Sequence, residues 1–109
     1  MSGYYKVPAH IFMETAMLEQ YYNDGVYFIN FYADWCGTCK KMKPTIEKLE
    51  SEFVDIKFLH INVDECSALV KEFDIRAIPA FIIMNNGKEI NRVVGMSMIT
   101  PLRKVLVEI

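Results

Sequence analysis

Two long apolar runs constrain the fold of this chain more than any other feature. Val26–Ala33 and Ile56–Val63 consist mainly of aromatic and aliphatic residues, and each run carries a polar residue near its centre, Asn30 or His60. A strand with one face in water alternates apolar and polar residues, whereas a strand covered on both faces does not. The runs therefore predict strands of a parallel or mixed sheet with helices on both faces.

Helical patterns separate these runs. After the first two cysteines, apolar residues recur at intervals of four, three and four: Met42, Ile46, Leu49 and Phe53. This spacing places them on one face of an amphipathic helix, which Pro44 is expected to kink. Further patterns predict an edge strand at Tyr4–Val7, a helix at Ala9–Tyr22 and a short helix within Asp64–Phe73.

The end of the chain predicts a hairpin and a last helix. Asn86-Gly87 stands between the strand-like runs Ala80–Met84 and Glu89–Val94, and an Asn-Gly pair there is typical of a tight hairpin. Thr100 is expected to cap the last helix, with Pro101 in its first position and with Leu102, Val105 and Leu106 facing the core. The order βαβαβαββα predicts an α/β fold, a central mixed sheet of about five strands flanked by about four helices.

Length and composition exclude several classes of function. A chain of 109 residues that is 52% hydrophobic and 24% charged suits one core, so we expect a single domain over residues 1–109. A formal net charge of −2 provides no basic surface for nucleic acid. Because the sequence contains no membrane-spanning apolar run and no secretory signal pattern, we expect a cytoplasmic protein without a membrane partner. We also expect a monomer.

Cys36 and Cys39 are the strongest functional signal. They follow a buried strand and open a helix, where free N–H groups and the helix dipole favour an anion. A thiol with a pKa near 8.5 is about 3% ionised at pH 7, whereas one with a pKa near 7 is about half ionised. We expect Cys36, the more exposed, to attack disulfides and Cys39 to resolve the mixed disulfide. Lys40 and Lys41 add positive charge nearby.

Two structural interpretations compete with redox exchange. A zinc site needs four ligands, yet only Cys66, His10 and His60 could join the pair, without a second paired motif. A permanent disulfide across so short a loop is a weak clip that a reducing compartment would open. We therefore predict redox exchange without a metal, and an inert, buried Cys66 rather than a regulatory one.

The stretch Ala33-Asp34-Trp35-Cys36-Gly37-Thr38-Cys39-Lys40 closely resembles the active-site stretch of the thioredoxin family, Trp-Cys-Gly-Pro-Cys-Lys. Further landmarks extend the resemblance over essentially the whole chain: Asp24-Gly25, Asn62-Val63-Asp64, Ile78-Pro79, Asn86-Gly87-Lys88 and Gly95. The resemblance implies a thioredoxin fold and reduction of disulfides in client proteins by dithiol–disulfide exchange. It also implies no bound cofactor beyond the redox-active disulfide, and re-reduction by an NADPH-dependent thioredoxin reductase.

The resemblance further implies a client-binding groove. Pro79 would be a cis proline, and the backbone of Ile78 before it would pair with a client peptide. Trp35, Gly95 and Met96 would line a shallow apolar groove around Cys36. A cis peptide bond is practically restricted to X-Pro. The alternatives are that Pro79 merely starts a strand and that Trp35 is merely a packing residue.

Two positions depart from the family's pattern behind the cysteines. Thioredoxins usually carry a buried aspartate and a lysine where this chain has Asn30 and His60. We expect these residues to face each other across adjacent strands. Either neutral His60 acts as the base for Cys39, through a water, or the two form an uncharged hydrogen-bonded pair, and the second interpretation is favoured.

Thr38 replaces the proline usual between the two cysteines of the family. Its N–H and hydroxyl groups favour a nearby thiolate, so we predict a more oxidising reduction potential than a proline would give. Two other functions stay open. The protein could be an exchanger or isomerase with a narrow client range, or a non-catalytic module that binds partners around Trp35, Ile78 and Met96.

Overall fold

The computed structural model describes residues 25–109, so the predicted strand at Tyr4–Val7 and helix at Ala9–Tyr22 lie outside the described residues. The described elements, in chain order, are β1 (Val26–Tyr32), α2 (Gly37–Glu52), β2 (Lys57–Asn62), α3 (Ser67–Glu72), β3 (Ala80–Asn85), β4 (Lys88–Val94) and α4 (Ile99–Val107). They match the last seven elements of the predicted order. No helix in residues 25–109 combines the length and the apolar character needed to cross a membrane.

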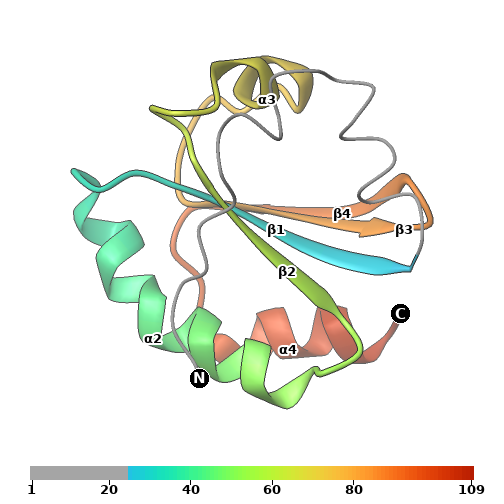
Figure 1. Ribbon diagram of the computed structural model, residues 1–109. Helices are drawn as coiled ribbons and strands as arrows, with labels where there is room; N and C mark the ends of the chain where they lie inside the picture. Colours follow the sequence, from blue (N-terminus) through green and yellow to red (C-terminus); the bar gives the residue numbers. More distant parts are fainter. Residues whose placement is uncertain (1–24) are drawn as a thin grey trace.

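The strands form one mixed sheet in the order β2-β1-β3-β4. β1 pairs with β2 in parallel and with β3 antiparallel, and β3 pairs antiparallel with β4. Figure 1 shows α3 over one face of the sheet and α2 and α4 over the other. The predicted mixed sheet with helices on both faces is confirmed.

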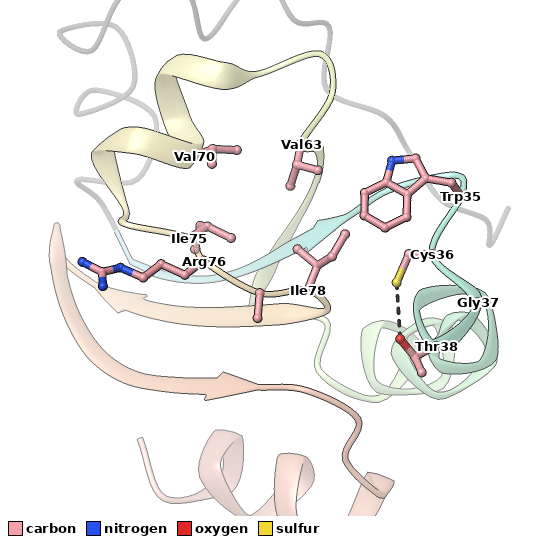
Figure 2. Close-up of a pocket in the computed structure, with 10 residues that line it drawn as sticks. Trp35, Cys36, Gly37, Thr38, Val63, Val70, Ile75, Arg76 and Ile78 are labelled. Atoms are coloured by element: carbon pink, nitrogen blue, oxygen red, sulfur yellow. Dashed lines mark hydrogen bonds between the residues drawn. The ribbon is translucent and has the colours of Figure 1, made fainter.

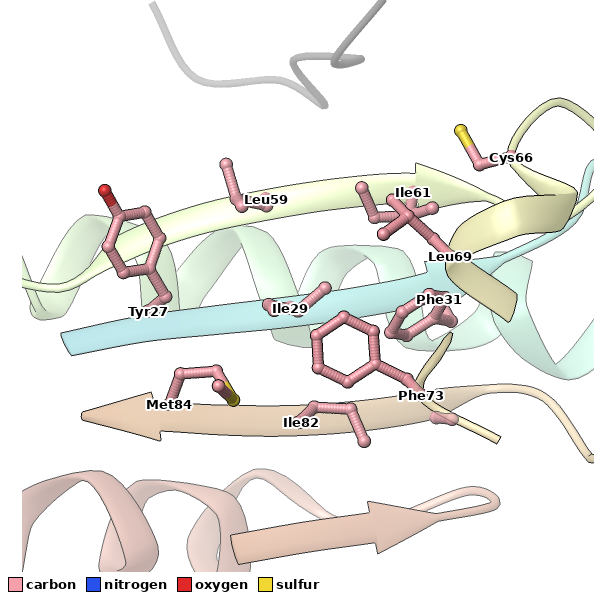
Figure 3. Packing of buried hydrophobic residues seen from close by; sticks show 11 residues of the cluster. Tyr27, Ile29, Phe31, Leu59, Ile61, Cys66, Leu69, Phe73, Ile82 and Met84 are labelled. Atoms are coloured by element: carbon pink, nitrogen blue, oxygen red, sulfur yellow. The ribbon is translucent and has the colours of Figure 1, made fainter. Parts of the chain in front are cut away.

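Alternate side chains of the central strands enter two separate cores. On one face, Ile29 and Phe31 of β1 pack with residues of β2, of β3 and of the α3 region (Figure 3). On the other face, Phe28 packs against α2 and α4. The apolar stripe of α2 is buried there at Met42, Ile46 and Leu49, and Phe53 packs half-buried beside it. Burial on both faces explains why Val26–Ala33 shows no polar alternation.

The hairpin between β3 and β4 has the predicted two-residue turn. Asn86 has a φ of 51° and Gly87 a φ of 82°, and Asn85 pairs with Lys88 on either side. Positive φ at both central residues gives a turn whose twist matches that of the strands, and Asn-Gly tolerates it. The prediction is confirmed, with β4 beginning one residue earlier than expected.

The prediction that Thr100 caps the last helix is wrong. α4 begins at Ile99, and Met98 stands at the cap position without a side-chain hydrogen bond. Pro101 is therefore the third helical residue, which is tolerated because the first four N–H groups of a helix have no partner within it. Leu102 and Leu106 are buried, as predicted.

The sheet brings four separate segments to one edge. Because β1 and β2 are parallel, the loops that follow both strands leave the sheet at the same edge, where Tyr32 is level with Asn62. At this edge Ala80, the first residue of β3, pairs with the end of β1 and with Val94 at the end of β4. Cys36, Val63 and Ile78 consequently meet there in one small cluster.

Candidate active site around Cys36 and Cys39

Cys36 and Cys39 occupy the N-terminus of α2, as predicted. Cys36 is the N-cap residue, with extended backbone angles of φ −86° and ψ 109°. Its Sγ accepts a hydrogen bond from the Cys39 N–H over 3.2 Å. The two residues are joined by a disulfide, with their Cα atoms 5.2 Å apart. The disulfide therefore closes across the first turn of α2.

The prediction that Cys36 is more exposed than Cys39 is wrong. Both residues are 5% exposed, because Cys36 packs into the small cluster that includes Ala33 and Ile78. The two cysteines differ instead in whether they line the surface pocket. Cys36 lines a surface pocket, and Cys39 is not among the described residues that line it. A client sulfur that enters the pocket consequently meets Cys36 first.

The pocket is large enough for several side chains of a peptide, about 670 Å³. Its wall next to Cys36 is formed by Trp35, Gly37 and Thr38, and the remaining lining residues are Val63, Val70, Ile75, Arg76, Ala77 and Ile78 (Figure 2). Binding sites for organic ligands usually have such an apolar lining with a few polar groups. Val63, Val70, Ile75, Arg76 and Ala77 were not predicted, because they come from the loop after β2, from α3 and from the segment before β3.

Gly95 and Met96, predicted to line the groove, are not among the described residues that line this pocket. Gly95 instead lies against Pro79, whose carbonyl accepts the Gly95 N–H over 2.7 Å. Gly95 has a φ of +93°, a region that glycine adopts without the strain other residues would suffer. Met96 follows at the surface, 57% exposed. The pocket thus extends from Cys36 toward α3.

The Ile78–Pro79 peptide bond is cis, as predicted. Ile78 is half-buried and contributes to both the pocket and the cluster around the cysteines. The loop that contains the cis bond therefore forms the pocket wall that faces Cys36.

Trp35 is held over the pocket by Asp64, for which the sequence predicted no role in the site. Its Nε1–H donates to Asp64 Oδ2 over 2.8 Å, and the Asp64 N–H donates to Asn62 Oδ1 over 2.9 Å. Trp35 remains 69% exposed, which does not fit a residue whose role is core packing. Asp64 connects the loop after β2 to the loop after β1, so the indole is oriented while its face stays accessible.

Thr38 places its hydroxyl beside the sulfur of Cys36. The distance from Thr38 Oγ1 to Cys36 Sγ is 3.3 Å, and the hydroxyl is the donor because a disulfide sulfur has no hydrogen. Gly37 also lines the pocket and has open space where a Cβ would stand. Lys40 is exposed, one residue after Cys39. The N-terminus of α2 therefore offers two hydrogen-bond donors to the Cys36 sulfur, the Cys39 N–H and the Thr38 hydroxyl.

Asn30 and His60 face each other across β1 and β2, as predicted. The Asn30 Nδ2–H donates to His60 Nδ1 over 3.2 Å, which requires that the ring proton be on Nε2. That proton is donated to Glu50 Oε1 on α2 over 3.0 Å. Burial lowers the pKa of His60 although Glu50 opposes the shift, so the ring is neutral. Both ring nitrogens are engaged, which favours the hydrogen-bonded pair over a catalytic base.

Glu50 was missed by the sequence analysis, although a signal for it exists. It lies four residues after Ile46 and one after Leu49, at the border of the apolar stripe of α2. A carboxylate at such a border can reach a polar group on the strand beneath it while remaining partly in water. Its side chain is 34% exposed.

His60 predicts a specific pH dependence of stability. Its pKa is lowered in the folded state, so between that lowered pKa and the unfolded value near 6.5 the unfolded chain binds the extra proton. The free energy of unfolding should therefore fall as the pH drops from 8 to 5. The free energy of unfolding of His60→Gln should fall by a smaller amount over the same pH range. Urea unfolding at both pH values measures this difference. Equal losses in the two proteins would contradict the assignment of a buried neutral imidazole.

Cys66 lies apart from the disulfide, buried at the N-cap of α3. Burial raises the pKa of its thiol, and Glu65 adds to the shift. A raised pKa reduces the thiolate fraction and burial limits access, so both favour the inert interpretation. Within residues 25–109 there is no group of three or more His, Cys, Asp or Glu side chains that could hold a metal ion.

Comparisons with known proteins agree with this geometry. The family model for thioredoxin matches residues 11–108. The chain is 39% identical to thioredoxin H2 of Arabidopsis thaliana over 67 residues, 62% of this chain and 50% of that protein. It is 38% identical to thioredoxin of Chlamydia caviae over 72 residues, 66% of this chain and 71% of that protein. The chain thus spans only about half the length of some of the curated relatives it matches.

The fold comparison covers nearly the whole chain. The crystal structure of thioredoxin from Trypanosoma brucei brucei superposes with a TM-score of 0.84 at 26% identity, over 98% of this chain and 90% of that one. The family model and the fold comparison agree with each other. The chain therefore belongs to the thioredoxin family.

Proposed function

We propose that this protein reduces disulfides in client proteins by dithiol–disulfide exchange. The observation that carries this proposal is the Cys36–Cys39 disulfide at the N-terminus of α2, with Cys36 lining an apolar pocket. A sulfur at this position is next to unpaired helical N–H groups, which stabilise a negative charge. Redox chemistry here requires no group other than the two thiols.

The reaction proceeds in two exchanges. In the reduced protein, the Cys36 thiolate attacks one sulfur of a client disulfide, the client S–S bond breaks, and the other client sulfur leaves as a thiolate. The Cys39 thiolate then attacks Cys36 Sγ, which closes the Cys36–Cys39 disulfide and releases the second client sulfur. The client gains two electrons and, from the two cysteines, two protons. The oxidised protein that results is the form described here.

Neighbouring groups assist the first exchange. The Cys39 N–H already points to Cys36 Sγ, and the Thr38 hydroxyl lies 3.3 Å from it, so both can donate to the thiolate without rearrangement. Trp35 and Ile78 flank the sulfur and offer apolar surface to a client segment. We assign the pairing of client backbone to Ile78, at the cis peptide bond.

Recycling and location complete the proposal. The disulfide must be reduced after each turnover, and we propose that an NADPH-dependent thioredoxin reductase does so.

We also propose that residues 1–109 act as a single monomeric domain in the cytoplasm. The curated relatives include a mitochondrial thioredoxin of Schizosaccharomyces pombe, so imaging of the tagged full chain in cells should distinguish cytoplasm from mitochondria.

An insulin reduction assay tests the proposed activity. Catalytic amounts of the protein should accelerate the reduction of insulin disulfides by dithiothreitol, because only a small fraction of the dithiothreitol is thiolate at neutral pH, whereas the helix N-terminus favours the thiolate of Cys36. The matched control is the same protein, reduced and then alkylated, which should add nothing to the rate of dithiothreitol alone. Equal rates with the untreated and the alkylated protein would refute the activity and leave the binding-module interpretation.

Thr38 should set part of the reduction potential. A thiolate accepts a stronger hydrogen bond than a disulfide sulfur does, so the Thr38 hydroxyl stabilises the dithiol form and makes the potential less negative. A net hydrogen bond of about 0.5–1.5 kcal/mol corresponds to about 10–30 mV for this two-electron couple. Thr38→Val and Thr38→Pro should both have more negative potentials than the unmodified protein, as measured by equilibration with glutathione.

Thr38→Ser is the matched control, because it keeps the hydroxyl and should keep the potential. A potential of the unmodified protein equal to or below that of Thr38→Pro would show that the threonine does not make this protein more oxidising.

A further inference from the structure

The pocket beside Cys36 has a charged residue at only one position. Of the ten described residues that line it, Arg76 alone is an aspartate, glutamate, lysine or arginine. Figure 2 shows Arg76 at the end of the pocket opposite Trp35 and Cys36, with Ile75 and Ile78 between them. A segment that enters with its sulfur at Cys36 and runs along the pocket therefore passes an apolar wall before it reaches a cation.

Arg76 is only weakly held by its neighbour. Its Nε–H donates to Asp74 Oδ1 over 3.0 Å, and the side chains of the pair are 84% and 70% exposed. Ion pairs that are this exposed contribute little to stability, so another carboxylate can displace Asp74. Arg92 on β4 differs, because Glu89 binds it through two hydrogen bonds of 2.9 and 2.8 Å. Among the described residues that line the pocket, Arg76 is therefore the cation that a bound client can reach.

We propose that Arg76 selects client segments that carry an aspartate or glutamate at one particular position, counted in residues from the reactive cysteine of the client. The client lies extended along the pocket, its cysteine at Cys36, an apolar side chain against Val70 and Ile75, and its carboxylate at the Arg76 guanidinium. Arginine suits this role because its planar fork can bind a carboxylate through two hydrogen bonds. The inference rests on the proposed function and adds the chemistry of the preferred client.

The selectivity is modest in size and sensitive to salt. An exposed ion pair changes affinity by a factor of about two to five, and screening reduces the effect once the ionic strength exceeds about 0.1 M. An apolar contact would not weaken with salt. If Arg76 binds the client carboxylate, the preference for acidic clients should therefore be small and should disappear at high ionic strength.

Disulfide-linked peptide dimers provide the test. Each peptide carries one cysteine and, at one position two to five residues to either side of it, either aspartate, asparagine or lysine. We expect kcat/KM for reduction to be highest for aspartate at one register, about two- to fivefold above asparagine. The preference should disappear in Arg76→Gln and reverse toward lysine in Arg76→Glu.

Two further variants sharpen the result. Asp74→Asn removes the carboxylate that competes for Arg76, and asparagine tolerates the φ of 52° at this position, so the preference for aspartate should increase. Lys88→Gln makes the same change in net charge as Arg76→Gln, but at the far end of the β3–β4 hairpin, and should leave the preference intact.

The outcomes separate this inference from the activity. If all peptides are reduced at equal rates, the proposed function holds and the selectivity is refuted. If a preference for aspartate survives in Arg76→Gln or in high salt, Arg76 is not its source and the inference is likewise overturned. If no peptide and no insulin is reduced, the proposed function itself fails.

Discussion

Cys36→Ser should reduce the rate of insulin reduction to that of dithiothreitol alone, while Cys39→Ser should stop the reaction halfway. A serine hydroxyl does not ionise near neutral pH and cannot displace a sulfur, so without Cys36 the first exchange does not start. With Cys39 replaced, the first exchange still occurs, but no thiol remains next to the mixed disulfide. The client should then stay covalently attached through Cys36.

The trapped complex can be measured directly. Incubation of reduced Cys39→Ser with a cell extract, followed by electrophoresis without reductant, should give adducts that dithiothreitol releases. Cys66→Ala combined with Cys39→Ser is the control, because Cys66 is buried and burial raises the pKa of its thiol. Adducts that vanish in this double variant would mean that Cys66, rather than Cys36, attacks the client.

Phe28→Ala should lower the free energy of unfolding by about 3–5 kcal/mol, the range for removal of a buried aromatic side chain. Phe28 is fully buried between the sheet and the helices α2 and α4. Its ring lies 4.8 Å from that of Phe58 and 5.5 Å from that of Phe81, measured between centroids. The substitution would leave both neighbouring rings beside a cavity.

Urea unfolding measures this loss, and Val54→Ala is the matched control. Val54 is 83% exposed, so its truncation should change the free energy of unfolding by less than about 0.5 kcal/mol. If Phe28→Ala does not fold, Phe28→Leu should still show a clear but smaller loss. A loss below about 1 kcal/mol for Phe28→Ala would contradict a closely packed core at this position.

Local sequence patterns predicted most element types correctly, because hydrophobic periodicity reports which faces of a segment are buried. The unbroken run Val26–Ala33 predicted a strand covered on both faces, and two separate cores lie on either side of β1. Helix boundaries were less predictable. Ile99 packs half-buried against the core, so α4 begins there rather than after Thr100. This contact between distant segments outweighs the capping preference of threonine.

The chemistry of the cysteine pair was also predictable, since it depends on residues close together in the chain. Two cysteines three positions apart at the first turn of a helix place their sulfurs within bonding reach, whatever surrounds them. Strand pairing similarly made Asn30 and His60 neighbours, since each occupies the centre of an apolar run in a parallel pair.

The sequence by itself therefore determined the strand and helix types of the described elements, the disulfide pair and the Asn30–His60 pair. Only the tertiary structure decided that Glu50 meets His60, that Asp64 orients Trp35, and that Arg76 shares a pocket with Cys36. These contacts depend on how α2 crosses β2 and on how the loops at one sheet edge meet. Periodicity specifies the face on which a residue lies, but long-range packing selects which residue of another segment it contacts.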